Sequence, residues 1–132
     1  MELTSNKAIE DAAIRWVIEL ESAAGRQARD VRYVGAAVDI ESPPRHIEVK
    51  AAGRSSRGFE LPFEPRQMEA ALSDPDFYLY VVENVRQGDP ALFTLRVLGG
   101  DRLRRLLDRA KEHRYFSVPW PTAEYDSCPV GL

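Results

Sequence analysis

Alternating apolar and polar side chains mark the stretch Val38-Asp39-Ile40-Glu41-Ser42-Pro43-Pro44-Arg45-His46-Ile47-Glu48-Val49-Lys50. Successive side chains of a β-strand point to opposite faces, so this alternation predicts two strands joined at the two prolines. One face of the predicted pair is apolar and belongs to the core: Val38, Ile40, Ile47 and Val49. The other face carries the charges of Asp39, Glu48 and Lys50.

The centre of this predicted hairpin decides which charges meet. A connection centred between Pro43 and Pro44 pairs residues whose numbers sum to 87, which places Asp39 opposite Glu48. Directly opposed residues have Cβ atoms roughly 4.5–5.5 Å apart, and like charges there destabilise the pair. A divalent cation would offset the repulsion, since Mg²⁺ takes oxygen ligands that include one or two carboxylates. A longer loop about the same centre preserves the pairing, whereas a β-bulge does not.

Lys50 follows Glu48 by two residues, so its ammonium group is predicted to point into the same space. There it could orient or deprotonate a water molecule, or stabilise charge on a phosphate. Spacing alone leaves a second interpretation open, namely a strand pair whose polar face is solvated. In that case the three charges only neutralise one another.

Length and composition restrict the class of protein. The chain has 132 residues, of which 44% are hydrophobic and 30% charged, as expected for one globular domain. No apolar run approaches the roughly 18 residues of a membrane span, so we expect no membrane partner. The single cysteine, Cys128, excludes an internal disulfide and favours a reducing, cytoplasmic location. The net charge of −3 argues against a stand-alone, high-affinity nucleic-acid binder but allows a local basic patch.

The rest of the pattern predicts an α/β fold with a mixed sheet. Helices are expected at 8–24, 65–72 and 103–110, and strands at 31–40, 47–51, 59–63, 77–82 and 91–98. The 77–82 segment is almost entirely apolar or aromatic, which is typical of a strand covered on both faces. We expect one domain over residues 1–114, and then an irregular tail over 115–132. This tail would pack Phe116, Trp120 and Tyr125 on the body or on a partner.

Several motifs point to a known family. In chain order they are Glu21 to Gly25-Arg26, Val38-Asp39-Ile40 with Ser42, Ile47-Glu48-Val49-Lys50, Glu64, and Tyr78-Leu79-Tyr80-Val81-Val82 with Asn84-Val85. The aspartate and the E-x-K strand resemble the PD-(D/E)XK nuclease superfamily. More narrowly, residues 9–98 resemble the NO VEIN protein C-terminal domain family, which also occurs in bacterial restriction- and helicase-associated proteins. The chain departs from that family at Gly35-Ala36-Ala37, where glycine and tyrosine usually stand shortly before the aspartate.

The resemblance implies a restriction-endonuclease-like αβββαβ core, extended here by a C-terminal strand, a helix and the tail. It implies that Asp39, Glu48 and the Val49 carbonyl bind Mg²⁺ (or Mn²⁺), and that Lys50 assists the attacking water. Glu21 would correspond to the acidic residue that this superfamily often carries on its first helix. The implied activity is metal-dependent phosphodiester hydrolysis of DNA, in a restriction or phage-defence context and targeted by a protein partner or homodimer.

The residues leave alternatives open at several positions. Glu19 flanks the apolar stripe of the first helix as Glu21 does, and either is compatible with a surface role. Glu64 precedes Pro65 and is expected to complement a helix N-terminus rather than a metal. Gln67 on the same helix could reach the site, although a solvated helix face is the simpler expectation.

Arg54 and Arg57 flank two serines in a glycine-bounded loop, where they could bind DNA phosphates or remain solvated. The alternative to the nuclease is a non-catalytic module that keeps the fold and serves as a scaffold for protein or DNA. The intact set of Asp39, Glu48 and Lys50 favours the enzyme.

Overall fold

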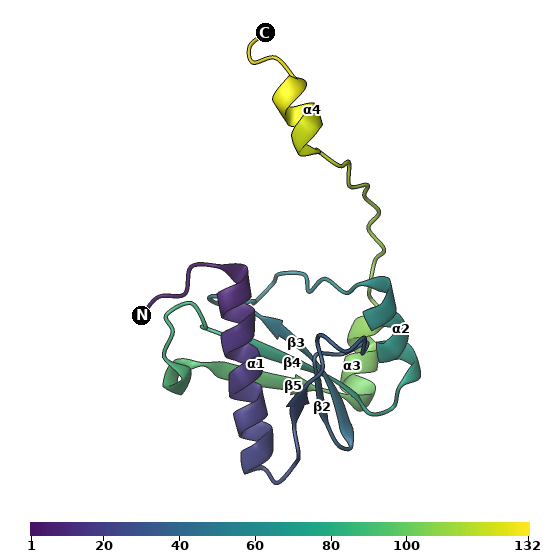
Figure 1. The fold of residues 1–132 in the computed structure, drawn as a ribbon. Coiled ribbons are helices and arrows are strands. Elements are labelled where there is room, and N and C mark those ends of the chain that lie inside the picture. Colours follow the sequence, from purple (N-terminus) through teal and green to yellow (C-terminus); the bar gives the residue numbers. More distant parts are fainter.

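Two parallel strands, β3 (Arg45–Ala51) and β4 (Phe77–Glu83), form the centre of a five-stranded mixed sheet. The computed structural model describes residues 1–132 (Figure 1). The strand order is β1-β2-β3-β4-β5, and every pair other than β3–β4 is antiparallel. The outer strands are short: β1 (Arg29–Asp30), β2 (Ile40–Ser42) and β5 (Thr94–Leu98).

The helices start and stop at residues suited to those roles. Helix α1 (Asn6–Ala23) begins after Ser5, whose hydroxyl accepts a hydrogen bond from the Ala8 N–H, and it is followed by Gly25 with φ of 89°. Helix α2 (Pro65–Ser73) has proline in its first turn. A 3₁₀ turn, η1 (Pro90–Leu92), leads into β5, and helix α3 (Gly100–Leu107) follows that strand.

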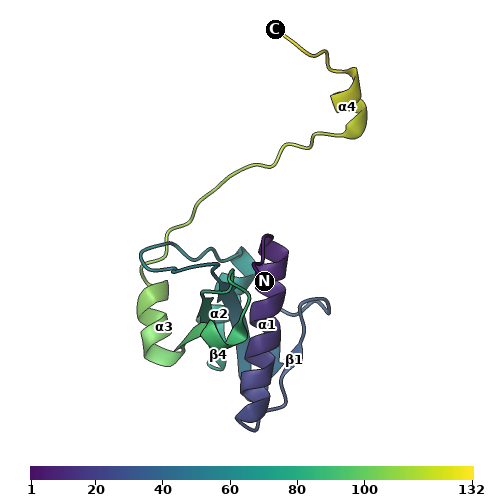
Figure 2. The same ribbon diagram turned by 90° about the vertical axis from the view of Figure 1, so that its left-hand side faces the viewer.

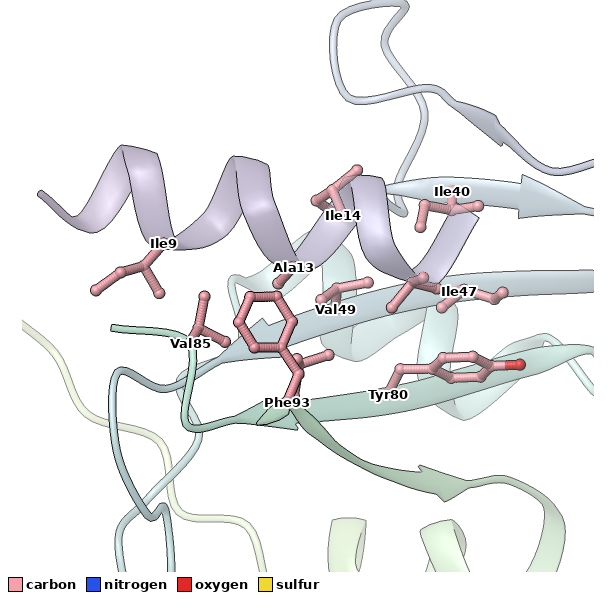
Figure 3. Packing of buried hydrophobic residues seen from close by; sticks show 11 residues of the cluster. Ile9, Ala13, Ile14, Ile40, Ile47, Val49, Tyr80, Val85 and Phe93 are labelled. Atoms are coloured by element: carbon pink, nitrogen blue, oxygen red, sulfur yellow. The ribbon is translucent and has the colours of Figure 1, made fainter. Parts of the chain in front are cut away.

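Helices cover both faces of the sheet, which gives three layers (Figure 2). Helix α1 packs on one face through side chains that include Ile9, Ala13 and Ile14, against Ile47 and Val49 of the sheet (Figure 3). A second cluster on the other face joins α2 and α3 to the sheet: Val31, Val38, Ala71, Phe77, Leu79, Val81 and Leu103. The burial of β4 on both sides explains why its sequence is a continuous apolar run.

Much of the predicted element order is confirmed. The N-terminal helix, the helix after Glu64 and the strands over 47–51 and 77–82 are all present, and the sheet is mixed. The strand predicted over 59–63 does not form, because this segment is a loop that carries the chain from β3 to α2 and includes Pro62, which cannot donate to a ladder. The strand predicted over 31–40 is also wrong, since the residues between β1 and β2 form turns, with Gly35 at φ of 81°.

The predicted hairpin register holds only as far as Ile40. The pairs Ile40–Ile47 and Ser42–Arg45 confirm the centre between the prolines. At the next residue the Asp39 N–H donates to the Ile47 carbonyl (3.1 Å), so Asp39 and Ile40 both lie opposite Ile47. This is the count of a β-bulge, and it moves Asp39 out of the predicted pairing directly opposite Glu48. The same shift explains why Val38 packs with the α2–α3 cluster and not on the α1 face, as its alternation predicted.

The tail leaves the body of the protein. It contains a short helix, α4 (Thr122–Ser127), that the sequence did not predict, and it extends away from the sheet in both views (Figures 1 and 2). The side chains of Phe116, Trp120 and Tyr125 are exposed, so they do not pack on the body, and their packing on a partner stays a prediction. None of the helices has the length and the apolar character needed to cross a bilayer.

Deleting residues 115–132 should leave the stability of the domain unchanged, because none of these residues contributes to either core cluster. We expect the thermal unfolding midpoint to stay within about 2 °C of wild type. The comparison is Ile47→Ala, which opens a cavity in the core and should lower the midpoint by roughly 10 °C. A large loss of stability on deletion would show that the tail packs on the body in solution.

Candidate active site

A groove of about 370 Å³ opens where the sheet loses one of its strands. Strand β2 begins at Ile40, whereas β3 continues to Ala51, so the last residues of β3 have no β2 partner. The groove lies between the first half of α1 and the start of α2, and it is lined by Asn6, Ile9, Glu10, Asp39, Glu48, Val49, Lys50, Ala51, Gly53, Gln67 and Arg86. The structure thus brings together Asp39, Glu48, Val49 and Lys50, as the sequence predicted.

The bulge aims the Asp39 side chain along the open edge of β3. Its Oδ2 atom accepts a hydrogen bond from the Val49 N–H (2.9 Å), which has no β2 partner. A strand residue directs its N–H and its carbonyl to the same side, so the Val49 carbonyl also faces this edge. Asp39 therefore lies beside the Val49 carbonyl, which the family resemblance implies as a further metal ligand.

Glu48 is the most buried charged group of the groove, with 2% of its surface exposed. Its Oε2 atom accepts a hydrogen bond from Gln67 Nε2 (3.0 Å) and lies 3.3 Å from Lys50 Nζ. Its Oε1 atom is buried and has no hydrogen-bond partner. Leaving such an oxygen buried without a partner is costly, so this atom marks a position where a ligand fits.

Gln67 fixes the orientation of both charged groups, contrary to the solvated helix face expected for it. Its Oε1 atom accepts from the Glu64 N–H (2.9 Å) and from Lys50 Nζ (3.4 Å). Two donors at that atom leave the amide nitrogen to donate to Glu48. The pair Glu64 and Gln67 forms the capping box of α2, which confirms the helix-end role predicted for Glu64.

Both carboxylates have a raised affinity for protons. Burial and the negative charge of Asp39 raise the pKa of Glu48 to about 7, although Lys50 opposes the shift. Burial also raises the pKa of Asp39, the charge of Glu10 adds to this, and the Val49 N–H acts against it. A cation in the groove would stabilise the ionised form of both groups.

Lys50 is held close to the acids by an apolar neighbour as well as by charge. Its side chain is only 18% exposed, and Nζ lies 5.1 Å from the centre of the Phe63 ring. This cation–π contact and the two polar contacts at Nζ restrict the ammonium group to the groove.

Glu21 lies elsewhere, at the other end of α1. Its carboxylate accepts two hydrogen bonds from Arg26 (2.7 Å each) and one from the Tyr80 hydroxyl (2.9 Å). Burial alone would raise the pKa of Glu21, but these hydrogen bonds outweigh it and lower the pKa. Eleven residues separate Glu21 from Glu10, or roughly 16 Å along a helix, so the structure does not bring Glu21 to the groove.

Glu10 is the carboxylate that α1 contributes to the groove, and the sequence analysis missed it. Its side chain pairs with Arg32 of the loop before Asp39 (3.2 Å). An acidic residue at either end of α1 fits the sequence pattern equally well, and only the direction in which the helix crosses the sheet decides between them.

The predicted DNA-binding arginines lie on the loop after β3, outside the lining of the groove. Arg54 and Arg57 are exposed, and Ser56 between them donates to the buried Glu83 through its backbone and its hydroxyl. Arg86, which the sequence analysis did not single out, is the arginine that lines the groove.

The donor set suits a hard, oxygen-binding cation. No three His, Cys, Asp or Glu side chains lie close enough together to hold a metal by themselves. The available ligands are two carboxylates, one of which has a buried, unpartnered oxygen, and the Val49 carbonyl. Magnesium characteristically binds one or two carboxylates and completes its shell with water and substrate oxygens, so the site fits Mg²⁺.

These features define a class: a mixed α/β protein with an acidic pair and a lysine in a groove at the edge of its sheet. The chain belongs to the family described as Protein NO VEIN, C-terminal, whose model matches residues 9–95. That match includes every residue of the groove from Ile9 to Arg86 and omits α3 and the tail. No curated protein and no solved structure matches the chain.

The positions of Glu10 and Glu21 predict opposite effects of their substitution. Glu21→Gln should lower the free energy of unfolding by about 1–3 kcal/mol, because Arg26 loses its buried counter-charge. It should leave Mn²⁺ affinity, measured by calorimetry, unchanged. Glu10→Gln should weaken Mn²⁺ binding with little effect on thermal unfolding. Loss of Mn²⁺ binding in a fully stable Glu21→Gln chain would contradict this assignment.

The raised pKa of Glu48 predicts that the metal-free protein loses stability as the pH rises from about 4.5 to about 7. Over this range the folded state holds a proton that the unfolded state has released. The free energy of unfolding therefore falls as the pH rises, by an amount of the order of 1–3 kcal/mol. Carboxyls with lowered pKa, such as Glu21, add a slope of the opposite sign near pH 4.5, which fades at higher pH as the unfolded state also becomes ionised.

Thermal unfolding in a chelator at pH 5, 6, 7 and 8 measures this slope. Glu48→Gln should flatten it, whereas Glu69→Gln, at an exposed glutamate of α2, should leave it unchanged. Equal slopes in wild type and Glu48→Gln would show that Glu48 keeps an ordinary pKa.

Proposed function

We propose that this protein is a metal-dependent phosphodiesterase that acts on DNA, with a core of the restriction-endonuclease-like PD-(D/E)XK kind. The observation that carries the proposal is the buried, unpartnered Glu48 Oε1 atom beside Asp39, with Lys50 Nζ 3.3 Å from the other Glu48 oxygen. The element order α1, β1–β3, α2, β4 agrees with the αβββαβ core that the sequence motifs imply.

Asp39, Glu48 and the Val49 carbonyl would hold Mg²⁺ or Mn²⁺ at the open edge of β3. Such an ion supplies Lewis-acid stabilisation of a phosphate and lowers the pKa of an attacking water. Gln67 keeps Glu48 in the orientation that leaves Oε1 for the ion. Glu10 adds negative charge at the opposite wall of the groove.

Lys50 is the group that would meet the reacting phosphate. Its ammonium is held beside Glu48 and Gln67, where a positive charge favours the build-up of negative charge on the phosphate oxygens. An ammonium group donates in three directions, and two of its donors are directed at Glu48 and Gln67. The third remains for a water molecule or a phosphate oxygen.

The surface supports targeting by another protein. The net charge is −3, so we expect the protein alone to bind DNA weakly and a partner, a second copy or another domain to raise its affinity for the target. We extend this to a restriction or phage-defence context on the resemblance of the sequence motifs alone.

A second candidate is a non-catalytic scaffold. The exposed aromatic side chains of the tail favour it, because Phe116, Trp120 and Tyr125 contact no core residue and are typical of segments that bind a protein. The two candidates differ in whether the groove turns over a substrate.

Nicking of supercoiled plasmid in Mg²⁺, Mn²⁺ or a chelator tests the enzyme. Wild type should nick in either metal, whereas Asp39→Asn and Lys50→Ala should each lower the rate by about 100-fold or more. The first removes a proposed metal ligand, and the second removes the positive charge beside the reacting phosphate. Glu19→Ala, at an exposed glutamate of α1, is the matched control and should keep full activity. Rates that ignore these substitutions would indicate a contaminant, and no nicking in either metal would favour the scaffold.

A further inference from the structure

The groove holds two cationic side chains, and only one of them has a carboxylate partner. Lys50 contacts Glu48 and Gln67, as described above. Arg86 lines the same groove, is exposed, and forms no ion pair within 4 Å. An unpaired guanidinium beside an acidic metal site leaves one position in the groove where an anion is stabilised.

The backbone holds Arg86 in this position. The Arg86 N–H donates to the Gly53 carbonyl (3.0 Å), and the Arg86 carbonyl accepts from the Leu3 N–H (2.6 Å). Further backbone hydrogen bonds join the segments that follow β3 and β4, from the Ala52 N–H to Val82 and from the Val85 N–H to Ala52. Arg86 is therefore fixed to the same pair of strands that carries Glu48 and Lys50.

Gly53 lets the arginine side chain lie across the groove wall. A Cβ atom at Gly53 would be 3.1 Å from Arg86 Nε and 3.3 Å from Arg86 Cβ, which is tighter than most real contacts. Gly53 does not occupy the left-handed region, so its backbone alone does not demand glycine. The close approach of Arg86 accounts for the absence of a side chain there.

We infer that Arg86 is a phosphate-binding, positioning residue, which holds a backbone phosphate of duplex DNA next to the phosphate that contacts Lys50 and the metal ion proposed at Asp39 and Glu48. A guanidinium group binds two phosphate oxygens through its fork of N–H donors, which sets the position of the strand as well as its affinity. This inference rests on the proposed function, because it takes the anion of the groove to be a DNA phosphate.

Binding of a fluorescent 20-bp duplex, measured by anisotropy in Ca²⁺ at several salt concentrations, tests the inference without turnover. Arg86→Ala should weaken binding about 10-fold and reduce the slope of log affinity against log salt by about 1, because one phosphate contact is lost. Arg86→Lys should recover part of the affinity, since it keeps the charge but loses the fork. Arg102→Ala, at an exposed arginine of α3 outside the groove, is the matched control.

Gly53→Ala gives an independent test that leaves the arginine in the sequence. Its new methyl group should displace the guanidinium and weaken DNA binding, while the thermal midpoint changes by only a few degrees. Wild-type affinity in both Arg86→Ala and Gly53→Ala, or an equal loss in Arg102→Ala, would overturn the inference.

Plasmid nicking by the same variants separates this inference from the proposed function. If wild type nicks DNA and Arg86→Ala nicks and binds as well as wild type, the phosphodiesterase stands and the role of Arg86 is wrong. If wild type binds DNA through Arg86 but nicks nothing in Mg²⁺ or Mn²⁺, the phosphodiesterase is wrong. A raised KM in Arg86→Ala with a smaller change in kcat supports both.

Discussion

The burial of the Glu48 carboxylate next to Asp39 is the constraint on which the rest of the site depends. Two acidic groups at one edge of a sheet would repel each other, and burial removes the water that would screen them. The structure answers with three neighbours: Gln67 and Lys50 contact one oxygen of Glu48, and the Val49 N–H contacts Asp39. The other oxygen of Glu48 stays unsatisfied. A fold selected for stability alone would be expected to place an apolar side chain there.

The late start of β2, at Ile40, creates the space for this arrangement. If β2 continued straight past Ile40, its backbone would take up the edge of β3 at Val49. The bulge at Asp39 ends the regular β2–β3 pairing at Ile40. The Asp39 carboxylate, in place of a strand backbone, then accepts the hydrogen bond from the Val49 N–H. The loop that follows β1 contributes as well, because Arg32 ties Glu10, Asp11 and Asp30 together beside this opening. The short β2 strand, its bulge and the loop after β1 thus leave the site open at the edge of the regular β3–β4 pair.

The sequence predicts the regular parts of the fold and misses the irregular ones. The apolar run of β4, the hairpin centre and the helix after Glu64 follow from periodicity and end signals, which are local properties of the chain. The bulge at Asp39, the turns over 31–39 and the loop over 59–63 depend on which segments meet in space. The site follows the same division. Asp39, Glu48 and Lys50 lie on or directly beside one strand pair and were predicted, whereas Glu10, Gln67 and Arg86 come from three other segments.

The confusion of Glu21 with Glu10 shows how one helix can carry two acidic residues of different purpose. Glu21 is buried with Arg26 and Tyr80, and Arg45 extends this chain of hydrogen bonds by donating to the tyrosine hydroxyl (2.7 Å). Both oxygens of the Glu21 carboxylate accept hydrogen bonds from protein groups, so this carboxylate anchors the end of α1 to the sheet. At the groove, by contrast, the carboxylates have unfilled capacity and raised pKa values. Acidic residues occur in both places. The carboxylate oxygens without hydrogen-bond partners distinguish a ligand-binding site from a cluster that stabilises the fold.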